Sequence, residues 1–124
     1  MAKFFKCNVC GQVITKALCS KMPVSCCGKP MQELIPGTVD ASIEKHVPVY
    51  EIDGNVLTVK VGSVTHPMLQ EHYIAFIAVQ TDKNVLIKKL TPQDAPEASF
   101  ALLEGEKVIE VYEYCNLHGL WSKK

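Results

Sequence analysis

Six cysteines and four histidines are the residues of this 124-residue sequence best suited to binding a metal ion. Five of the cysteines lie within the first 27 residues, whereas all four histidines and the sixth cysteine, Cys115, follow residue 45. Thiolates favour zinc, Cu(I) and iron, and imidazoles bind zinc, copper and iron. The sequence therefore offers two separate ligand sets, one rich in thiolate and one rich in imidazole.

Disulfide bonds are the alternative use for clustered cysteines. Disulfide frameworks are typical of secreted chains, and the first residues, Met1 to Cys7, lack the apolar stretch and cleavage site of a signal peptide. In a reducing cytosol, clustered cysteines more often hold a metal. We therefore expect a cytoplasmic protein with metal-bound thiolates.

The thiolate-rich set has the spacing of a metal-binding knuckle. It consists of two pairs separated by fifteen residues: Cys7, Cys10, Cys26 and Cys27. Four thiolates in a tetrahedron suit Zn²⁺ or a single iron, so the spacing leaves the metal open. The adjacent cysteines of the second pair must bend the backbone and distort the tetrahedron, unlike the spaced pairs of common zinc ribbons. Cys19 is left over, and we interpret it as a free thiol outside the site.

The imidazole-rich set is scattered along the chain. His66 and His72 flank a five-residue segment, and Cys115 precedes His118 by three residues at the end of an expected strand. A lone histidine such as His46 usually binds no metal, but turns at strand ends can bring such residues together. Several imidazoles with one thiolate suit a redox-active iron or copper, and zinc stays possible.

Glu44 and Lys45 directly precede His46. Adjacent opposite charges are usually a solvated surface pair. Because they share a segment with an expected ligand, these two residues could instead cover an open coordination position of the metal.

The overall charge limits the classes of partner. Thirteen Lys and Arg balance thirteen Asp and Glu, which argues against nucleic acid or an anionic membrane as the main partner. No apolar run approaches the roughly 18 residues of a membrane span. Hydrophobic residues make up 48% of the chain, enough for a packed core.

The pattern of apolar residues predicts a mostly β protein in two parts. Residues 1–36 form a module too short to be stable without a cross-link. In residues 37–124, the alternation of Leu57, Val59 and Val61 predicts a half-buried strand after an Asp53-Gly54 hairpin turn. Further strands are expected at 73–79, 84–90, 98–103 and 107–115, and no long amphipathic helix. Six or seven short strands indicate a small Ig-like β-sandwich.

The motifs resemble those of the desulfoferrodoxins, the two-iron form of superoxide reductase, over essentially the whole sequence. Residues 1–36 resemble desulforedoxin, and residues 37–124 resemble the catalytic domain shared with neelaredoxin. The matching segments are Cys7 to Gly11, Cys26 to Met31, Glu44 to Pro48, His66 to Met68 with His72, and Cys115 to Trp121.

The resemblance implies two irons per chain. One would be a distorted FeS₄ centre held by the four cysteines of the first set. The other would have four equatorial imidazoles and one axial thiolate, from His46, His66, His72, His118 and Cys115. The position opposite the thiolate would be open in the ferrous state. Glu44 would occupy it in the ferric state, with Lys45 beside it.

The resemblance also implies an activity and partners. The protein would be an oxidoreductase that detoxifies superoxide under oxidative stress by one-electron reduction to hydrogen peroxide. It would take electrons from a rubredoxin-type donor and form a homodimer. Three alternatives stay open: a zinc-stapled module on a β-sandwich interaction domain, an electron carrier that uses only the FeS₄ centre, and some dismutase activity.

Overall fold

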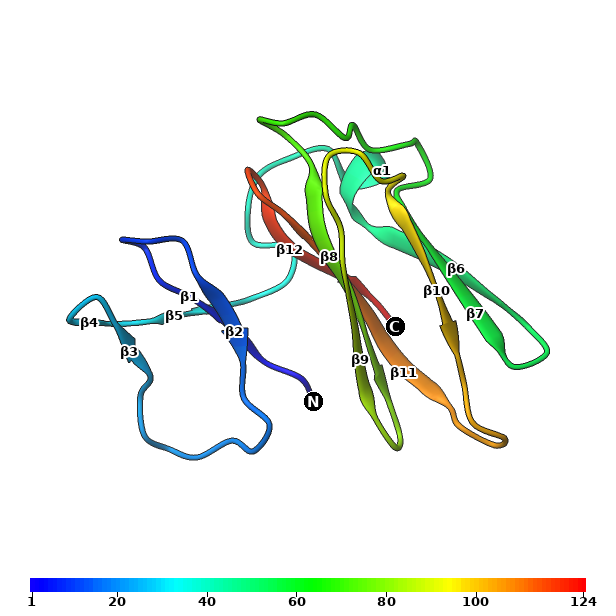
Figure 1. Ribbon diagram of the computed structural model, residues 1–124, viewed down its shortest axis with the longest axis horizontal. Helices are drawn as coiled ribbons and strands as arrows, with labels where there is room; N and C mark the ends of the chain where they lie inside the picture. The colour runs from blue at the N-terminus through cyan, green and yellow to red at the C-terminus, as the bar shows by residue number, and fades with distance from the viewer. The chain divides into compact units, whose positions relative to one another are not determined.

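The chain forms two units, Met1–Ile35 and Pro36–Lys124, in a computed structural model that describes residues 1–124 (Figure 1). The boundary expected from the sequence, after residue 36, lies one residue from this division. The longest helix is a single turn, α1 (Ile43–His46), so no helix is long and apolar enough to cross a membrane.

Short antiparallel strands build the first unit. Its three-stranded sheet has β1 in the centre and consists of β2 (Val13–Thr15), β1 (Phe4–Lys6) and β5 (Gln32–Leu34). A two-residue hairpin pairs β3 (Ser25–Cys26) with β4 (Lys29–Pro30). The buried apolar residues are Phe4, Cys7 and Met31. So few buried side chains cannot stabilise 35 residues, and the unit depends on a cross-link.

Two antiparallel sheets build the second unit. One sheet has the order β10-β7-β6, from β10 (Glu97–Ala101), β7 (Val56–Val61) and β6 (Pro48–Asp53). The other has the order β12-β11-β8-β9, from β12 (Gly119–Lys123), β11 (Val108–Cys115), β8 (Ile74–Thr81) and β9 (Val85–Lys89). The first, second and fifth of the seven strands share one sheet, as in Ig-like sandwiches.

The core lies between these sheets. The alternating residues Leu57, Val59 and Val61 of β7 are at most 1% exposed, as the period-2 pattern predicted. They face apolar side chains of the other sheet, among them Ile77. Cys115, at the end of β11, belongs to the same core cluster. One of the expected metal ligands is thus anchored in the packed core.

The prediction of a mostly β chain with a small N-terminal module and a β-sandwich is confirmed. The apolar run 73–79 forms most of β8, which lies between β11 and β9 as a central strand. Glu44 and Lys45 lie in the helical turn α1, together with His46.

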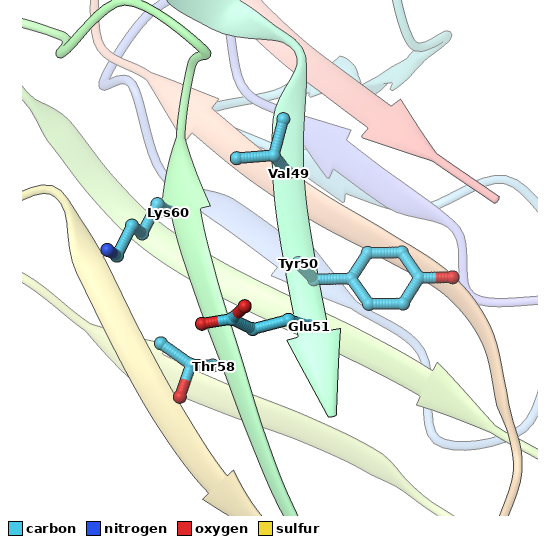
Figure 2. A pocket seen from close by; sticks show the side chains of 5 residues that line it. All are labelled: Val49, Tyr50, Glu51, Thr58 and Lys60. Carbon is cyan, nitrogen blue, oxygen red and sulfur yellow. The ribbon is translucent and has the colours of Figure 1, made fainter. Parts of the chain in front are cut away.

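The outer face of the β10-β7-β6 sheet has a shallow depression of about 260 Å³ (Figure 2). Val49, Glu51, Thr58 and Lys60 line it, while the ring of Tyr50 extends to the other side of its strand and packs against the core. None of the expected metal ligands takes part in it.

Candidate metal centres

The four N-terminal cysteines of the first unit converge on one point. Their sulfur atoms all lie within 4.8 Å of one another. Sγ of Cys26 is 3.6 Å from Sγ of Cys10 and 3.9 Å from Sγ of Cys27. Metal–sulfur bonds of about 2.3 Å in a tetrahedron place neighbouring sulfurs roughly 3.8 Å apart. The spacing therefore fits one tetrahedral ion, either iron or Zn²⁺.

Two backbone turns bring the sulfur pairs together. In the turn after β1, the N–H groups of Val9 and Cys10 each donate to Sγ of Cys7 at 3.4 Å. In the β3–β4 turn, Cys27 has a φ of 53° and is the only non-glycine residue with a positive φ. This left-handed conformation is the backbone bend that the adjacent cysteines demanded, and it is uncommon outside glycine.

Neighbouring groups shift the pKa values of the Cys7 and Cys26 thiols in opposite directions. The backbone N–H groups of Cys10 and Val9 lower the pKa of Cys7 to about 6. The thiols of Cys10 and Cys7 raise the pKa of Cys26 to about 12. Four crowded sulfurs therefore do not all ionise alone. A bound cation supplies the positive charge that makes four thiolates compatible.

The four histidine rings of the second unit form a square. Neighbouring ring centroids are 4.7–5.0 Å apart in the order His46, His66, His72, His118. The diagonal from His46 to His72 measures 6.3 Å. Neighbouring rings meet at 79–88°, whereas the diagonal pair is inclined by only 25°. Such an arrangement points one nitrogen of each ring toward a common centre.

The nitrogen separations match a metal-centred plane. Nε2 of His46 lies 3.2 Å from Nε2 of His66 and 3.1 Å from Nδ1 of His118. Metal–nitrogen bonds of about 2.1 Å place adjacent in-plane nitrogens roughly 3.0 Å apart. Nε2 of His72 is buried without any hydrogen-bond partner. A buried orphan nitrogen at the fourth corner is what a metal ligand leaves when described without its ion.

Cys115 lies close enough to the histidine square to be a fifth candidate ligand. Cys115 is fully buried. Its Sγ atom and one nitrogen each of His46, His66 and His72 all lie within 4.8 Å of one another. Sγ is also 3.9 Å from Nδ1 of His118. Burial raises the pKa of the Cys115 thiol, so the thiolate forms here with a cation bound.

Backbone carbonyls select the nitrogens that face the centre. Nδ1 of His46 is 2.7 Å from the carbonyl oxygen of Ser42, and Nδ1 of His66 is 2.7 Å from that of Pro67. A proton on each Nδ1 donates to these oxygens, which leaves Nε2 free as the ligand atom. Burial lowers the pKa of His66 to about 4 and also lowers that of His46. Both rings are therefore neutral and able to bind metal at physiological pH.

Three segments at one end of the sandwich position these ligands (Figure 1). Helix α1 ends in His46, the segment between β7 and β8 contains His66 and His72, and Cys115 and His118 flank the β11–β12 turn. The first two segments touch at Gly62, which has a φ of +83°. A Cβ there would lie 2.7 Å from the carbonyl oxygen of Glu44, so only glycine permits this approach.

Glu44 and Lys45 are exposed residues on α1 beside the histidine square. Burial lowers the pKa of His72, and the positive charge of Lys45 adds to this effect. A hollow of about 320 Å³ beside α1 is lined by Glu44, Ser63 and Lys123 among others. The structure thus brings Lys45 within electrostatic range of the imidazoles. Neither side chain is hydrogen-bonded to a histidine nitrogen.

Two further residues of this region were not expected to matter. Nε1 of Trp121 donates to the carbonyl oxygen of His118 at 2.9 Å, and its ring lies 5.2 Å from that of His46. Glu113 is fully buried without a hydrogen-bond partner, and burial raises its pKa to about 9. As a neutral acid it adds no negative charge near Cys115. Glu113 lies two residues before Cys115 in β11, and alternate residues of a strand face the same side. This spacing was the sequence signal that Glu113 is buried.

Cys19 lies outside both ligand groups. It is exposed, in the segment between β2 and β3, and neither group of converging ligand atoms includes it.

Known proteins share this arrangement. The family model described as Desulfoferrodoxin matches residues 38–124. This chain belongs to the desulfoferrodoxin family. A desulfoferrodoxin of Syntrophotalea carbinolica is 45% identical over 97% of this chain and 94% of its own length. The predicted family membership is confirmed.

Solved structures of superoxide reductases share the fold. The crystal structure of the superoxide reductase from Treponema pallidum has a TM-score of 0.85 and 42% identity, and the match covers 100% of this chain and 99% of that one. The superoxide reductase (1Fe-SOR) from Giardia intestinalis has a TM-score of 0.56 and 33% identity, covering 64% of this chain and 95% of that one. The chain therefore has a superoxide reductase fold, with a Cys₄ group and a histidine–cysteine group that fit a two-iron pattern.

Proposed function

We propose that this protein is a superoxide reductase that converts superoxide, one electron and two protons into hydrogen peroxide at the histidine–cysteine site. The observation that supports this most is the geometry of five donors. Four imidazoles form a square, and the buried thiol of Cys115 lies beside it. This set leaves the side opposite Cys115 for a substrate.

The ligand types suit iron with an open position. When bound, the iron would supply the electron and the coordination position for the small anion. Neutral imidazoles leave its charge largely uncompensated. The single thiolate of Cys115 would donate electron density to the bound iron, as thiolates do in haem enzymes.

Lys45 and Glu44 would act on what reaches the open side. The ammonium group of Lys45 gives a neutral protein a local positive potential, which attracts superoxide and holds water that can deliver a proton. Glu44 would close the site after hydrogen peroxide leaves. Closing takes place after the electron transfer, so we do not assign Glu44 to the capture of superoxide.

The electron supply completes the proposal. A rubredoxin-type donor would reduce the protein, and the Cys₄ centre, loaded with iron, would relay electrons or act as a structural clamp. We also propose that the chain acts as a cytoplasmic homodimer, which light scattering of the purified protein would test.

Product stoichiometry tests the reaction. Iron-loaded, prereduced protein is mixed with superoxide, and hydrogen peroxide and dioxygen are counted against superoxide consumed. A reductase forms one hydrogen peroxide for each superoxide and oxidises one iron, without dioxygen. A dismutase forms half as much peroxide and an equal amount of dioxygen. Either the dismutase ratio or no reaction would overturn the proposal.

Cys115→Ser is the matched variant for this experiment. A serine hydroxyl fits the space but does not ionise as a thiol does, so the electron donation to the metal would be lost. We expect no reductase activity even in protein that keeps some iron at the site. Cys19→Ser removes an exposed thiol outside both sites and should react like the unaltered protein.

A further inference from the structure

Asn116 hydrogen-bonds the segment on both sides of a proposed ligand. It directly follows Cys115 in the β11–β12 turn. Its Oδ1 accepts from the N–H of Tyr73 at 2.8 Å, and its Nδ2 donates to the carbonyl oxygen of Glu71 at 3.1 Å. Its own N–H donates to the carbonyl oxygen of Tyr73 at 3.2 Å. Three hydrogen bonds from one residue therefore hold both neighbours of His72.

These bonds replace strand pairing where the sheet ends. The ladder between β11 and β8 shifts register between Tyr114 and Cys115, and its last pair joins Cys115 to Ile74. Beyond this irregularity, the side-chain amide of Asn116 takes the place of the backbone C=O and N–H groups that a continued strand would have offered. Irregularities of this kind are frequent next to active sites because they redirect side chains.

The orientation of His72 depends on this backbone more than that of its neighbours does. The rings of His46 and His66 are each fixed by a bond from Nδ1 to a backbone carbonyl. His72 makes no such bond, and its buried Nε2 has no partner in the protein. Its own backbone pairs only with Leu69, at 2.9 and 3.0 Å. The peptide groups on either side are the ones that Asn116 holds.

We propose that Asn116 is a positioning residue that fixes His72 against the Cys115–His118 turn and thereby sets the affinity and ligand field of the metal there. Asparagine is required because the position needs a donor and an acceptor at once. Alanine offers neither. Aspartate keeps the acceptor for Tyr73 but places a carboxylate against the carbonyl oxygen of Glu71. The inference rests on the metal site of the proposed function, and not on superoxide as the substrate.

Competition for iron tests the inference without any measurement of activity. Iron-loaded protein is titrated anaerobically with a ferrous chelator, and the iron left at each site is followed by its visible spectrum after oxidation. Substitution of residues that orient metal ligands typically lowers metal affinity about 10–100-fold. We expect Asn116→Ala to lose iron from the histidine site at about 10–100-fold lower chelator concentration. The thiolate-to-iron band of the remaining ferric site should shift, because the plane is distorted.

Two controls separate positioning from general stability. The Cys₄ site in the same chain should keep its iron unchanged. Asn84→Ala removes a 2.9 Å bond from an asparagine amide to Glu106 in the β8–β9 turn, remote from the ligands, and should leave both sites unchanged. Asn116→Asp, which keeps one of the two side-chain bonds, should fall between Asn116→Ala and the unaltered protein, and it serves if the alanine variant does not fold.

The outcomes distinguish this inference from the proposed function. If the unaltered protein binds iron at the histidine site and Asn116→Ala matches its affinity and spectrum, the positioning role is wrong and the reductase proposal stands. A loss of affinity of equal size in Asn84→Ala would also overturn the positioning role. If the unaltered protein binds no metal through its histidines, both proposals fail.

Discussion

Side chains around the histidine site fall into two groups, those whose removal would abolish metal binding and those whose removal would affect only the approach of superoxide. The imidazoles and Cys115 would hold the metal, whereas Lys45 is an exposed residue whose charge reaches the site without touching it. Substitution of Lys45 therefore separates the approach of superoxide from the binding of metal.

Lys45→Ala should slow the capture of superoxide by about threefold to tenfold at low salt, since charges that line a site raise association rates 10-fold or more together. The salt dependence of the rate should also flatten, because part of the screened attraction is gone. Pulse radiolysis at several ionic strengths measures both effects. Lys123, which lines the hollow beside α1, would account for steering that persists.

Lys60→Ala is the matched control for Lys45→Ala. It removes the same charge from the depression on the outer face of the β10-β7-β6 sheet, where no proposed ligand lies (Figure 2). Its capture rate should equal that of the unaltered protein at every salt concentration. Equal rates in Lys45→Ala and the unaltered protein at low salt would contradict the steering role.

The sequence was sufficient to name the residues that converge but not the atoms. Spacing and the family pattern pointed to nine candidate ligands, and the structure brings their side chains together in two groups. Which nitrogen of each histidine faces the metal depends on backbone carbonyls, such as that of Ser42, whose position no spacing rule gives. The contribution of Asn116 has the same origin, because it bonds residues 43 and 45 positions away.

At the scale of elements, local patterns predicted the strands that alternate or are uniformly apolar. The Asp53-Gly54 turn joins β6 to β7 as expected, with Asp53 paired to Val56. Strand β12 was not predicted, because its first three residues lie within the matching segment Cys115 to Trp121 and its five residues show no alternation. The two-residue strands β3 and β4 are too short to give a pattern, and exist where the Cys26-Cys27 bend folds the chain back.

The β3–β4 hairpin should depend on its metal. Cys26→Ser removes one of four ligands in a unit with few buried apolar residues, so the first unit should lose protection from hydrogen exchange. The histidine site should keep its iron and its capture rate. Hydrogen exchange followed by mass spectrometry, together with iron counting, measures both. Cys19→Ser, in the same unit, should change neither.

The alternative result for this hairpin concerns electrons. If the Cys₄ centre is only a clamp, Cys26→Ser loses stability while rereduction of the histidine site by a rubredoxin-type donor keeps its rate. A slower rereduction with a normal capture rate would show that the centre relays electrons. Full hydrogen-exchange protection in Cys26→Ser would contradict a structural role.

Glu106 lies in the turn between β10 and β11 and links it by hydrogen bonds to the β8–β9 turn. Its carboxylate accepts from the hydroxyl of Thr81, from the Leu103 N–H at 2.8 Å and from the Asn84 amide at 2.9 Å. These bonds, that of Thr81 first, lower the pKa of Glu106 below its ordinary value of 4.5. The native state therefore binds the proton less readily than the unfolded chain does.

Glu106→Gln should alter the acid limb of stability. A carboxyl with a lowered folded pKa stabilises the native state above about pH 4.5, and this contribution disappears as the pH falls through the folded value. The variant should have a lower Tm than the unaltered protein at pH 7, and the difference should shrink as the pH falls below 4.5. Thermal unfolding followed by circular dichroism at pH 7, 5 and 3.5 measures it, with the exposed Glu104→Gln as the control. A difference that grows on acidification would contradict this assignment.

At the scale of the whole molecule, the two units have different grounds for stability. The first has few buried apolar residues and would depend on a metal held by its four cysteines, whereas the second has a core cluster from both of its sheets. A metal-poor cell would therefore lose the first unit before the second. The one-iron protein from Giardia intestinalis, whose match covers 95% of its own chain but only 64% of this one, has a comparable fold over that shorter length.

A chain consisting of residues 36–124 should fold and bind one metal. It contains every proposed ligand of the histidine site and the whole core cluster. We expect one iron per chain, no FeS₄ bands, a thiolate-to-iron band on oxidation, and a superoxide capture rate within about twofold of the full chain, because capture uses only residues of this unit. Metal analysis, visible spectra and pulse radiolysis test this. An insoluble or metal-free product would show that the first unit is needed to form the site, whereas normal capture with slower rereduction would assign the first unit to the electron supply.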